Sequence, residues 1–163
     1  MKRFLFFACM AFLLGLGVSA LAAEQRGALA LIKEPLDPTF GSDVCVGIFD
    51  VTNGKDVPNM RTFRHHYCQG RYTLTLDGKR GQVVTLFGRS DFNKENGFLI
   101  LRKTDDRKVW LPDLEGMPSG QWVKRAPTED SGGVQVFYQA VPNFSQDISS
   151  VKWGRWWRGP RPQ

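Results

Sequence analysis

The chain has 163 residues, with 22 lysines and arginines against 16 acids and a formal net charge of +6. Hydrophobic residues make up 42% and charged residues 23%, which excludes collagen-like, coiled-coil and wholly disordered proteins. This length predicts a single domain. The frequent glycines and prolines between short apolar runs favour many brief strands over a few long helices.

Residues 1–22 have the pattern of a secretory signal. Lys2 and Arg3 form a charged start, an apolar stretch follows over 4–18, and Ala20-Leu21-Ala22 places small residues where signal peptidase cleaves. We therefore expect cleavage after residue 22 and an exported protein, either periplasmic or secreted. The alternative is a retained anchor, because the apolar run over 4–23 reaches about the 20 residues that can span a bilayer.

Cleavage would leave a neutral body and a basic tail. Residues 1–22 contain two of the 22 bases and no acid, so 20 bases remain against 16 acids. Four of these bases follow residue 149, namely Lys152, Arg155, Arg158 and Arg161. The body therefore lacks the positive charge expected of a protein that binds duplex DNA.

Two cysteines, Cys45 and Cys68, remain after cleavage. In an oxidising compartment such a pair predicts a disulfide, which contributes about 3 kcal/mol in the loop-entropy model. A metal, haem or redox role is the alternative, because His65 and His66 lie just before Cys68. Adjacent side chains on an extended strand point to opposite faces, so these histidines are poorly placed to bind one ion. We expect no cofactor.

Alternation of apolar and polar residues predicts a mainly β protein. Two β-hairpins are expected, at 71–76 with 82–88 and at 97–103 with 108–111. Further strands are expected at 28–32, 44–51, 121–123, 133–141 and 148–153, with one helical turn at 113–117. We expect one β domain over 23–153, made of N-terminal strands at 23–77 and a barrel at 81–153, and a basic, Trp-rich tail at 154–163.

The order of strands over 81–153 resembles a five-stranded OB-fold barrel. The matching stretches are GQVVTLFG at 81–88, GFLIL at 97–101, the turn Asp105-Asp106, and GVQV at 133–136. This resemblance implies a small antiparallel barrel, to which the strands of 23–77 and the disulfide are additions. Shorter stretches, 84–87 with 91–92 and 136–138 with 143–144, are similar to βγ-crystallins. Gln146-Asp147 has one acid where that family has two, so we assign no calcium site.

The second predicted hairpin offers a candidate binding surface. Alternation places aromatic and basic side chains on its outer face, namely Phe98, Arg102, Lys108 and Trp110. In OB folds this face and its flanking loops bind nucleic acid strands or sugars. The loops would add Arg89, Phe92 and Lys94 on one side and Asn143 and Phe144 on the other. The alternative is that Phe98, Ile100 and Trp110 form a second core beneath the N-terminal strands.

The C-terminal tail is the second candidate surface. It combines tryptophans and bases without an acid, namely Trp153, Arg155, Trp156, Trp157 and Arg158 among others. Such a segment suits contact with a membrane surface, an anionic polymer or a protein. The alternative is that Trp153 and one later tryptophan pack against the barrel while the arginines stay in solvent.

These patterns favour an exported, non-catalytic binding or assembly protein of the cell envelope. Its expected partner is an envelope protein or an anionic polymer, and not duplex nucleic acid. The alternative from another class is a small secreted hydrolase that uses loop carboxylates at 105–106, 113 with 115, or 129–130. Acids in turns commonly serve the turn geometry, which favours the binding role.

Overall fold

The computed structural model describes residues 27–36, 47–52, 54–62 and 69–162. These residues form two antiparallel sheets. The first sheet has the order β2-β1-β3-β6, from β1 (Ala28–Pro35), β2 (Gly47–Thr52), β3 (Gly70–Asp77) and β6 (Val109–Leu111). The second has the order β7-β8-β5-β4-β9, from β4 (Val83–Phe87), β5 (Phe98–Lys103), β7 (Trp122–Arg125), β8 (Val134–Gln139) and β9 (Ser150–Trp153). Three 3-10 turns accompany them, η2 (Met60–Thr62), η4 (Ser90–Phe92) and η5 (Phe144–Gln146).

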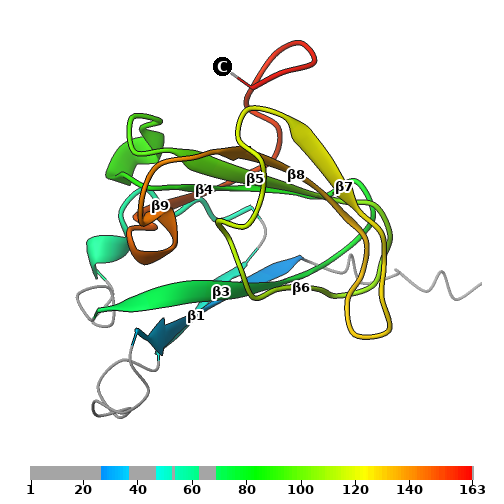
Figure 1. Ribbon diagram of the computed structural model, residues 1–163, viewed down its shortest axis with the longest axis horizontal. Coiled ribbons are helices and arrows are strands. Elements are labelled where there is room, and N and C mark those ends of the chain that lie inside the picture. The colour runs from blue at the N-terminus through cyan, green and yellow to red at the C-terminus, as the bar shows by residue number, and fades with distance from the viewer. Residues whose placement is uncertain (1–26, 37–46, 53, 63–68, 163) are drawn as a thin grey trace, which may run out of the picture.

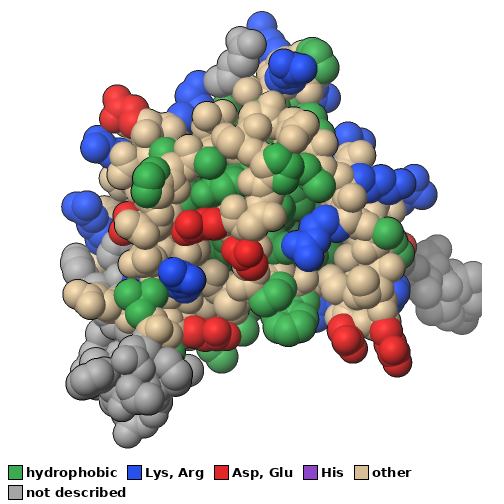
Figure 2. Space-filling view, in the orientation of Figure 1, with side chains coloured by type: hydrophobic (Ala, Val, Ile, Leu, Met, Phe, Trp, Pro, Cys, Tyr) green, Lys and Arg blue, Asp and Glu red, His purple; other side chains and the backbone are tan. Residues whose placement is uncertain are grey.

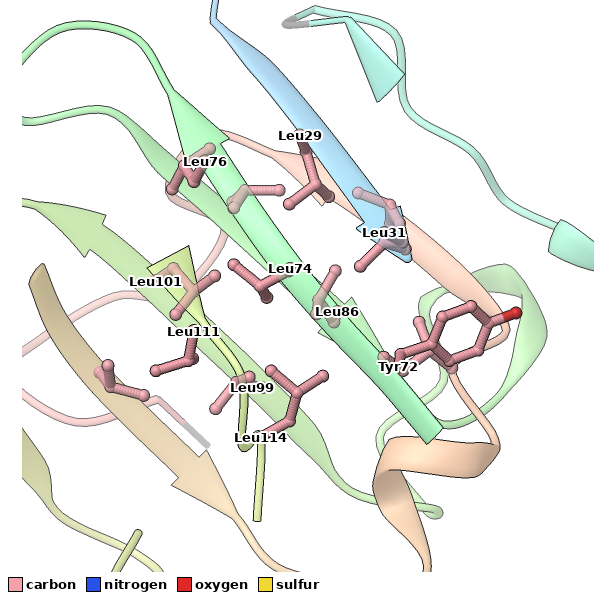
Figure 3. Packing of buried hydrophobic residues seen from close by; sticks show 14 of the residues in the cluster. Leu29, Leu31, Tyr72, Leu74, Leu76, Leu86, Leu99, Leu101, Leu111 and Leu114 are labelled. Atoms are coloured by element: carbon pink, nitrogen blue, oxygen red, sulfur yellow. The ribbon is translucent and has the colours of Figure 1, made fainter. Parts of the chain in front are cut away.

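The two sheets lie one above the other and enclose the main core (Figure 1). Apolar side chains at every second position of a strand point to the same side, and here that side faces the opposite sheet. Leucines of β1 and β3 point toward leucines of β4 and β5 (Figure 3). Leu29, Leu74, Leu86 and Leu99 are completely buried. The mainly β prediction is confirmed.

The prediction of two hairpins is wrong, because the two strands of each one lie in different sheets. β3 pairs with β1 and β6, whereas β4 pairs with β5 and β9, so the turn between them carries the chain from one sheet to the other. Gly78 and Gly81 permit this turn with φ values of +127° and +86°. β5 and β6 are separated in the same way. The sequence pattern does not distinguish a hairpin from two strands in opposite sheets, because the strands bury the same residues in both arrangements.

The predicted closed barrel does not form among the described strands, whose ladders remain two separate sheets. One edge of the second sheet is nevertheless covered by an upstream segment. Val57 exchanges backbone hydrogen bonds of 2.8 and 2.9 Å with Val151 of β9. Asp56 accepts a hydrogen bond of 2.8 Å from the Trp153 backbone N–H. This pairing satisfies backbone groups that an open edge strand would leave exposed.

Other predictions have different outcomes. Residues 113–117 form no helical turn, because the Asp113 carboxylate accepts hydrogen bonds from the backbone N–H groups of Glu115 and Gly116, at 2.8 and 3.0 Å, in a bend. The signal at 1–22, the two histidines and the cysteine pair Cys45 and Cys68 lie outside the described residues.

A candidate binding groove beside the C-terminal segment

The outer face of the second sheet carries an aromatic cluster, separate from the core between the sheets. Its buried members are Phe87, Phe98, Ile100, Phe137 and Trp157, and its partly buried members are Val83, Phe92, Trp122 and Trp156. An outer sheet face with this much apolar surface requires a cover. The chain supplies that cover from its own C-terminus.

The C-terminal segment, residues 154–162, lies on the side of the second sheet that faces away from the first (Figure 1). Gly154, with φ of +79°, lets the chain leave β9 and turn back over the sheet. The Trp156 indole N–H donates a hydrogen bond of 2.9 Å to the Thr85 hydroxyl. The Trp122 indole N–H donates one of 3.0 Å to the Pro160 carbonyl. The tail is therefore part of the fold.

Between this segment and the sheet lies a groove of about 490 Å³. It is lined by Gly81, Val83, Arg102, Trp122, Gln135, Arg155, Trp157, Gly159 and Pro160. This volume falls within the range of about 300–1,000 Å³ that is typical of ligand sites. The groove therefore brings together residues of both candidate surfaces, Arg102 from the sheet and Arg155 and Trp157 from the tail.

A polar row crosses the strands at the floor of the groove. Arg102 of β5 lies opposite Gln135 of β8, and Gln135 lies opposite Lys124 of β7. Directly opposed residues of antiparallel strands point to the same face, so these three side chains share the outer surface. The row leads from the groove toward the edge of the sheet at β7.

The groove is electropositive. The Arg155 guanidinium stacks 5.2 Å from the Trp157 ring centre and donates a hydrogen bond of 2.6 Å to the Gly159 carbonyl. Arg102 and Lys124 form no ion pair with a described residue, and none of the residues that line the groove is acidic. Figure 2 shows Lys and Arg side chains gathered around the C-terminal segment. The site therefore attracts carboxylate, phosphate or sulfate groups.

Beside Arg102, the next residue of β5 points inward. Lys103 is 1% exposed, and its ammonium group donates hydrogen bonds to the carbonyls of Leu76, at 3.3 Å, and Arg107. Burial lowers the pKa of Lys103, and the carboxylates of Asp105, Asp77 and Asp106 partly offset this effect. Lys103 thus links β3 to the turn that follows β5 and does not reach the groove.

The structure separates the four residues that the second hairpin would have placed on one face. Phe98 is buried beneath the tail, 5.6 Å from the Trp156 ring centre, and Arg102 lines the groove. Trp110 is 49% exposed on the outer face of the first sheet, and Lys108 is exposed just before β6. The second-core alternative holds for Phe98 and Ile100, but the C-terminal segment covers them instead of the N-terminal strands.

The flanking loops stay outside the groove. The ring centres of Phe92 and Phe87 lie 5.9 Å apart. The Lys152 ammonium group lies 4.4 Å from the ring centre of Phe92. Lys94 lies 5.7 Å from the Trp156 ring centre. The other expected loop residues are Arg89, which pairs with Glu95 at 3.1 Å, Phe144, which is buried in the main core, and Asn143, which is exposed.

Each tail tryptophan has a defined environment. Trp153 is buried in the core between the sheets, whereas Trp156 and Trp157 belong to the outer aromatic cluster. Arg155 and Arg158 are exposed. This arrangement matches the alternative in which the tryptophans of the tail pack and its arginines stay in solvent. Arg155 nevertheless lines the groove, where a ligand can contact it.

Sequence reasoning missed Trp122 and Gln135 as groove residues. Both lie on strands whose positions were predicted, but the partners of these strands were not. The signal that could have found them is the loop that ends in Gly132-Gly133, which allows 122–125 to pair with 134–137 as a hairpin. That pairing places Trp122 opposite Phe137 and Lys124 opposite Gln135.

Two further hollows are less suited to an anion. One of about 480 Å³ has mixed charge, because Asp147, Arg61 and Arg89 are all among its lining residues. The other measures about 190 Å³ and lies beside Trp110. The groove of the second sheet is larger than the latter and, unlike the former, contains no acid.

The loop carboxylates at 105–106 and at 113 with 115 hold turns. Asp105 accepts hydrogen bonds from the backbone N–H groups of Gly133, at 2.7 Å, and Arg107, at 3.0 Å. Asp106 accepts one of 2.6 Å from the Arg80 N–H. Glu115 accepts one of 2.6 Å from the Ser145 N–H. These carboxylates link loops that are distant in sequence.

Comparison with known proteins gives no relative: no family model, curated protein or solved structure matches the chain. Over the described residues, no helix has both the length and the apolar character needed to cross a bilayer.

Proposed function

We propose that the chain is an exported, non-catalytic binding protein of the cell envelope, and that it binds an anionic polymer in the groove. The observation that carries this proposal is Arg102, a base that has no ion-pair partner among the described residues and lies in a groove without acids. A guanidinium group presents a planar set of donors that matches carboxylate, sulfate and phosphate groups.

The course of the polar row supports a polymer over a small anion. Gln135 and Lys124 continue from Arg102 toward the β7 edge, so the basic surface extends beyond the groove itself. A chain with several negative charges contacts more than one of these groups at once. Multiple weak charge contacts of this kind add to the affinity and make it depend on salt.

The positions of the loop acids support binding over hydrolysis. Asp105, Asp106, Asp113 and Glu115 each accept hydrogen bonds from backbone N–H groups and thereby fix turns. A glycosidase needs a pair of carboxylates that flank the bond to be cleaved, and the groove residues include none.

Export and the disulfide belong to the same proposal. The sequence pattern of residues 1–22 supports export, and the cysteine pair supports a disulfide in an oxidising compartment. Cell fractionation tests the first, with recovery in the cytoplasm as the contradicting result. Alkylation of the denatured protein, with and without reduction, tests the second by mass.

Calorimetry with a panel of anionic polymers tests the binding role. We expect binding that weakens as salt increases, and a loss of about tenfold in affinity for Arg102→Gln, because each charged hydrogen bond contributes about 1.5–3 kcal/mol. The matched control is Arg71→Gln, an exposed arginine of β3 in the first sheet. Equal affinity of the Arg102→Gln variant and the unchanged protein would contradict the proposed site. Capture of a protein partner that survives this substitution would favour the assembly role.

A further inference from the structure

The polar row has a defined spacing. Arg102 and Lys124 lie two strands apart, with Gln135 of β8 between them. Neighbouring strands are separated by about 4.8 Å, so the backbone positions of the two bases are about 10 Å apart. The row therefore offers two positive charges separated by one neutral amide group.

This spacing discriminates among anionic polymers. A nucleic acid strand has a charge on every nucleotide, about 3.4 Å apart along the axis of a stacked helix, and polyphosphate has a charge on every unit. A polysaccharide with an acid on every second ring instead places a neutral ring between successive charges. Charge, neutral group and charge then follow in the same order on the ligand and on the protein.

The neutral position suits a sugar ring. The amide of Gln135 has both donors and an acceptor, which match the hydroxyl groups of a sugar. Trp122 lies two residues before Lys124 on the same face of β7, and its indole N–H is already bonded to the Pro160 carbonyl. Its exposed part is therefore carbon surface, against which the C–H groups of a sugar pack.

Building on the proposed function, we infer that the ligand is an acidic polysaccharide with a carboxylate on alternate rings. The chain crosses the strands along the row, with one carboxylate at Arg102, the next at Lys124 and the neutral ring over Gln135. The fork of donors on Arg102 binds its carboxylate through two hydrogen bonds, and Lys124 contributes a single charge.

Calorimetry with the purified protein tests this inference with four probes of similar length. They are an oligosaccharide with alternating uronate and neutral amino sugar, an oligogalacturonate with a carboxylate on every ring, inorganic polyphosphate and single-stranded oligothymidylate. We expect the alternating oligosaccharide to bind at least tenfold more tightly than the other three. Arg102→Gln and Lys124→Gln should each reduce that affinity by about tenfold. Arg71→Gln and Lys55→Gln, both at exposed positions outside the row, are the controls that leave it unchanged.

The outcomes separate this inference from the proposed function. Similar affinity for all four probes, lowered by Arg102→Gln, would overturn the ligand class while leaving an anion-binding groove. Retention of full affinity in Lys124→Gln would overturn the row as the path of the chain. Absence of binding to every probe would overturn both proposals. Circular dichroism of each variant checks that the substitutions preserve the fold.

Discussion

The Trp156 indole N–H donates a hydrogen bond of 2.9 Å to the hydroxyl of Thr85, a residue of β4 that is completely buried. The two residues are 71 positions apart in the chain. Their bond fixes the C-terminal segment to the outer face of the second sheet. The wall of the groove depends on this attachment, because Trp157 and Arg155 lie on the same segment.

Loss of this bond should destabilise the protein. Trp156→Phe keeps an aromatic ring but leaves the buried Thr85 hydroxyl without a partner, which costs about 1–3 kcal/mol in the free energy of unfolding. Urea denaturation of Trp156→Phe, Thr85→Val and the double variant measures the coupling, which we expect to be about 1 kcal/mol. Additive effects of the two substitutions would show that the bond contributes nothing.

The core between the sheets should dominate stability. Leu86 is completely buried, so Leu86→Ala removes apolar contacts and leaves a cavity, at a cost of about 2–5 kcal/mol. The control is Ile48→Ala, because Ile48 is 63% exposed on the first sheet. We expect its effect to stay within about 0.5 kcal/mol. Similar losses in the two variants, measured by thermal or chemical denaturation, would contradict the sandwich arrangement.

Substitutions at two glycines measure backbone strain and steric clash separately. Gly97 and Gly120 have nearly equal φ values of +73° and +74°. A Cβ atom at residue 97 would lie 2.6 Å from the Gln139 carbonyl oxygen, whereas nothing lies within 4 Å at residue 120. Gly120→Ala should therefore cost only about 1 kcal/mol of backbone strain. Gly97→Ala should cost clearly more, and equal midpoints of denaturation for the two variants would contradict this packing at the start of β5.

Lys103 should make stability depend on pH. Burial lowers the pKa of Lys103 in the folded state below its ordinary value of 10.5. At a pH between the folded-state pKa and 10.5, the unfolded chain therefore binds more protons than the folded chain. The free energy of unfolding therefore rises with pH in this window. The buried Lys33 acts in the same direction, since burial also lowers its pKa against the opposing charge of Asp147. Tyr138 has the opposite effect above pH 10: burial raises its pKa to about 12, so the folded chain keeps a proton that the unfolded chain loses, and the free energy of unfolding falls with pH.

Denaturation at several values between about pH 8 and 10 measures this slope. Lys103→Met should make the rise shallower, whereas Lys79→Met, at an exposed position, should leave it unchanged. A slope that is the same in the Lys103→Met variant and the unchanged protein would contradict the lowered pKa.

The positions of the strands were largely predictable, but their partners were not. Alternation identified the strands that contain Leu74 and Leu86, because each strand places alternate apolar side chains in the core between the sheets whichever sheet it joins. The assignment of those strands to opposite sheets depends on the turn at 78–82 and on the pairing of β3 with β1, which is distant in sequence. Local pattern contains no information about such long-range pairing.

The groove was predictable only in parts. Arg102 and Arg155 were both identified as candidates, on two surfaces that sequence reasoning kept apart. Their juxtaposition requires the chain to turn at Gly154 and to pack Trp157 against Trp122 at a ring-centre distance of 5.8 Å. Composition shows that the tail has tryptophans to bury, but the site at which they are buried depends on the tertiary fold.

The most direct test of the groove is heteronuclear NMR of the five tryptophan indole N–H signals during titration with an acidic polysaccharide. Trp122 and Trp157 line the groove, whereas Trp110 is exposed on the other sheet and serves as an internal control. We predict that the signals of Trp122 and Trp157 shift in proportion to the bound fraction while that of Trp110 stays in place. A shift at Trp110 with no change at Trp122 and Trp157 would contradict the groove as the binding site.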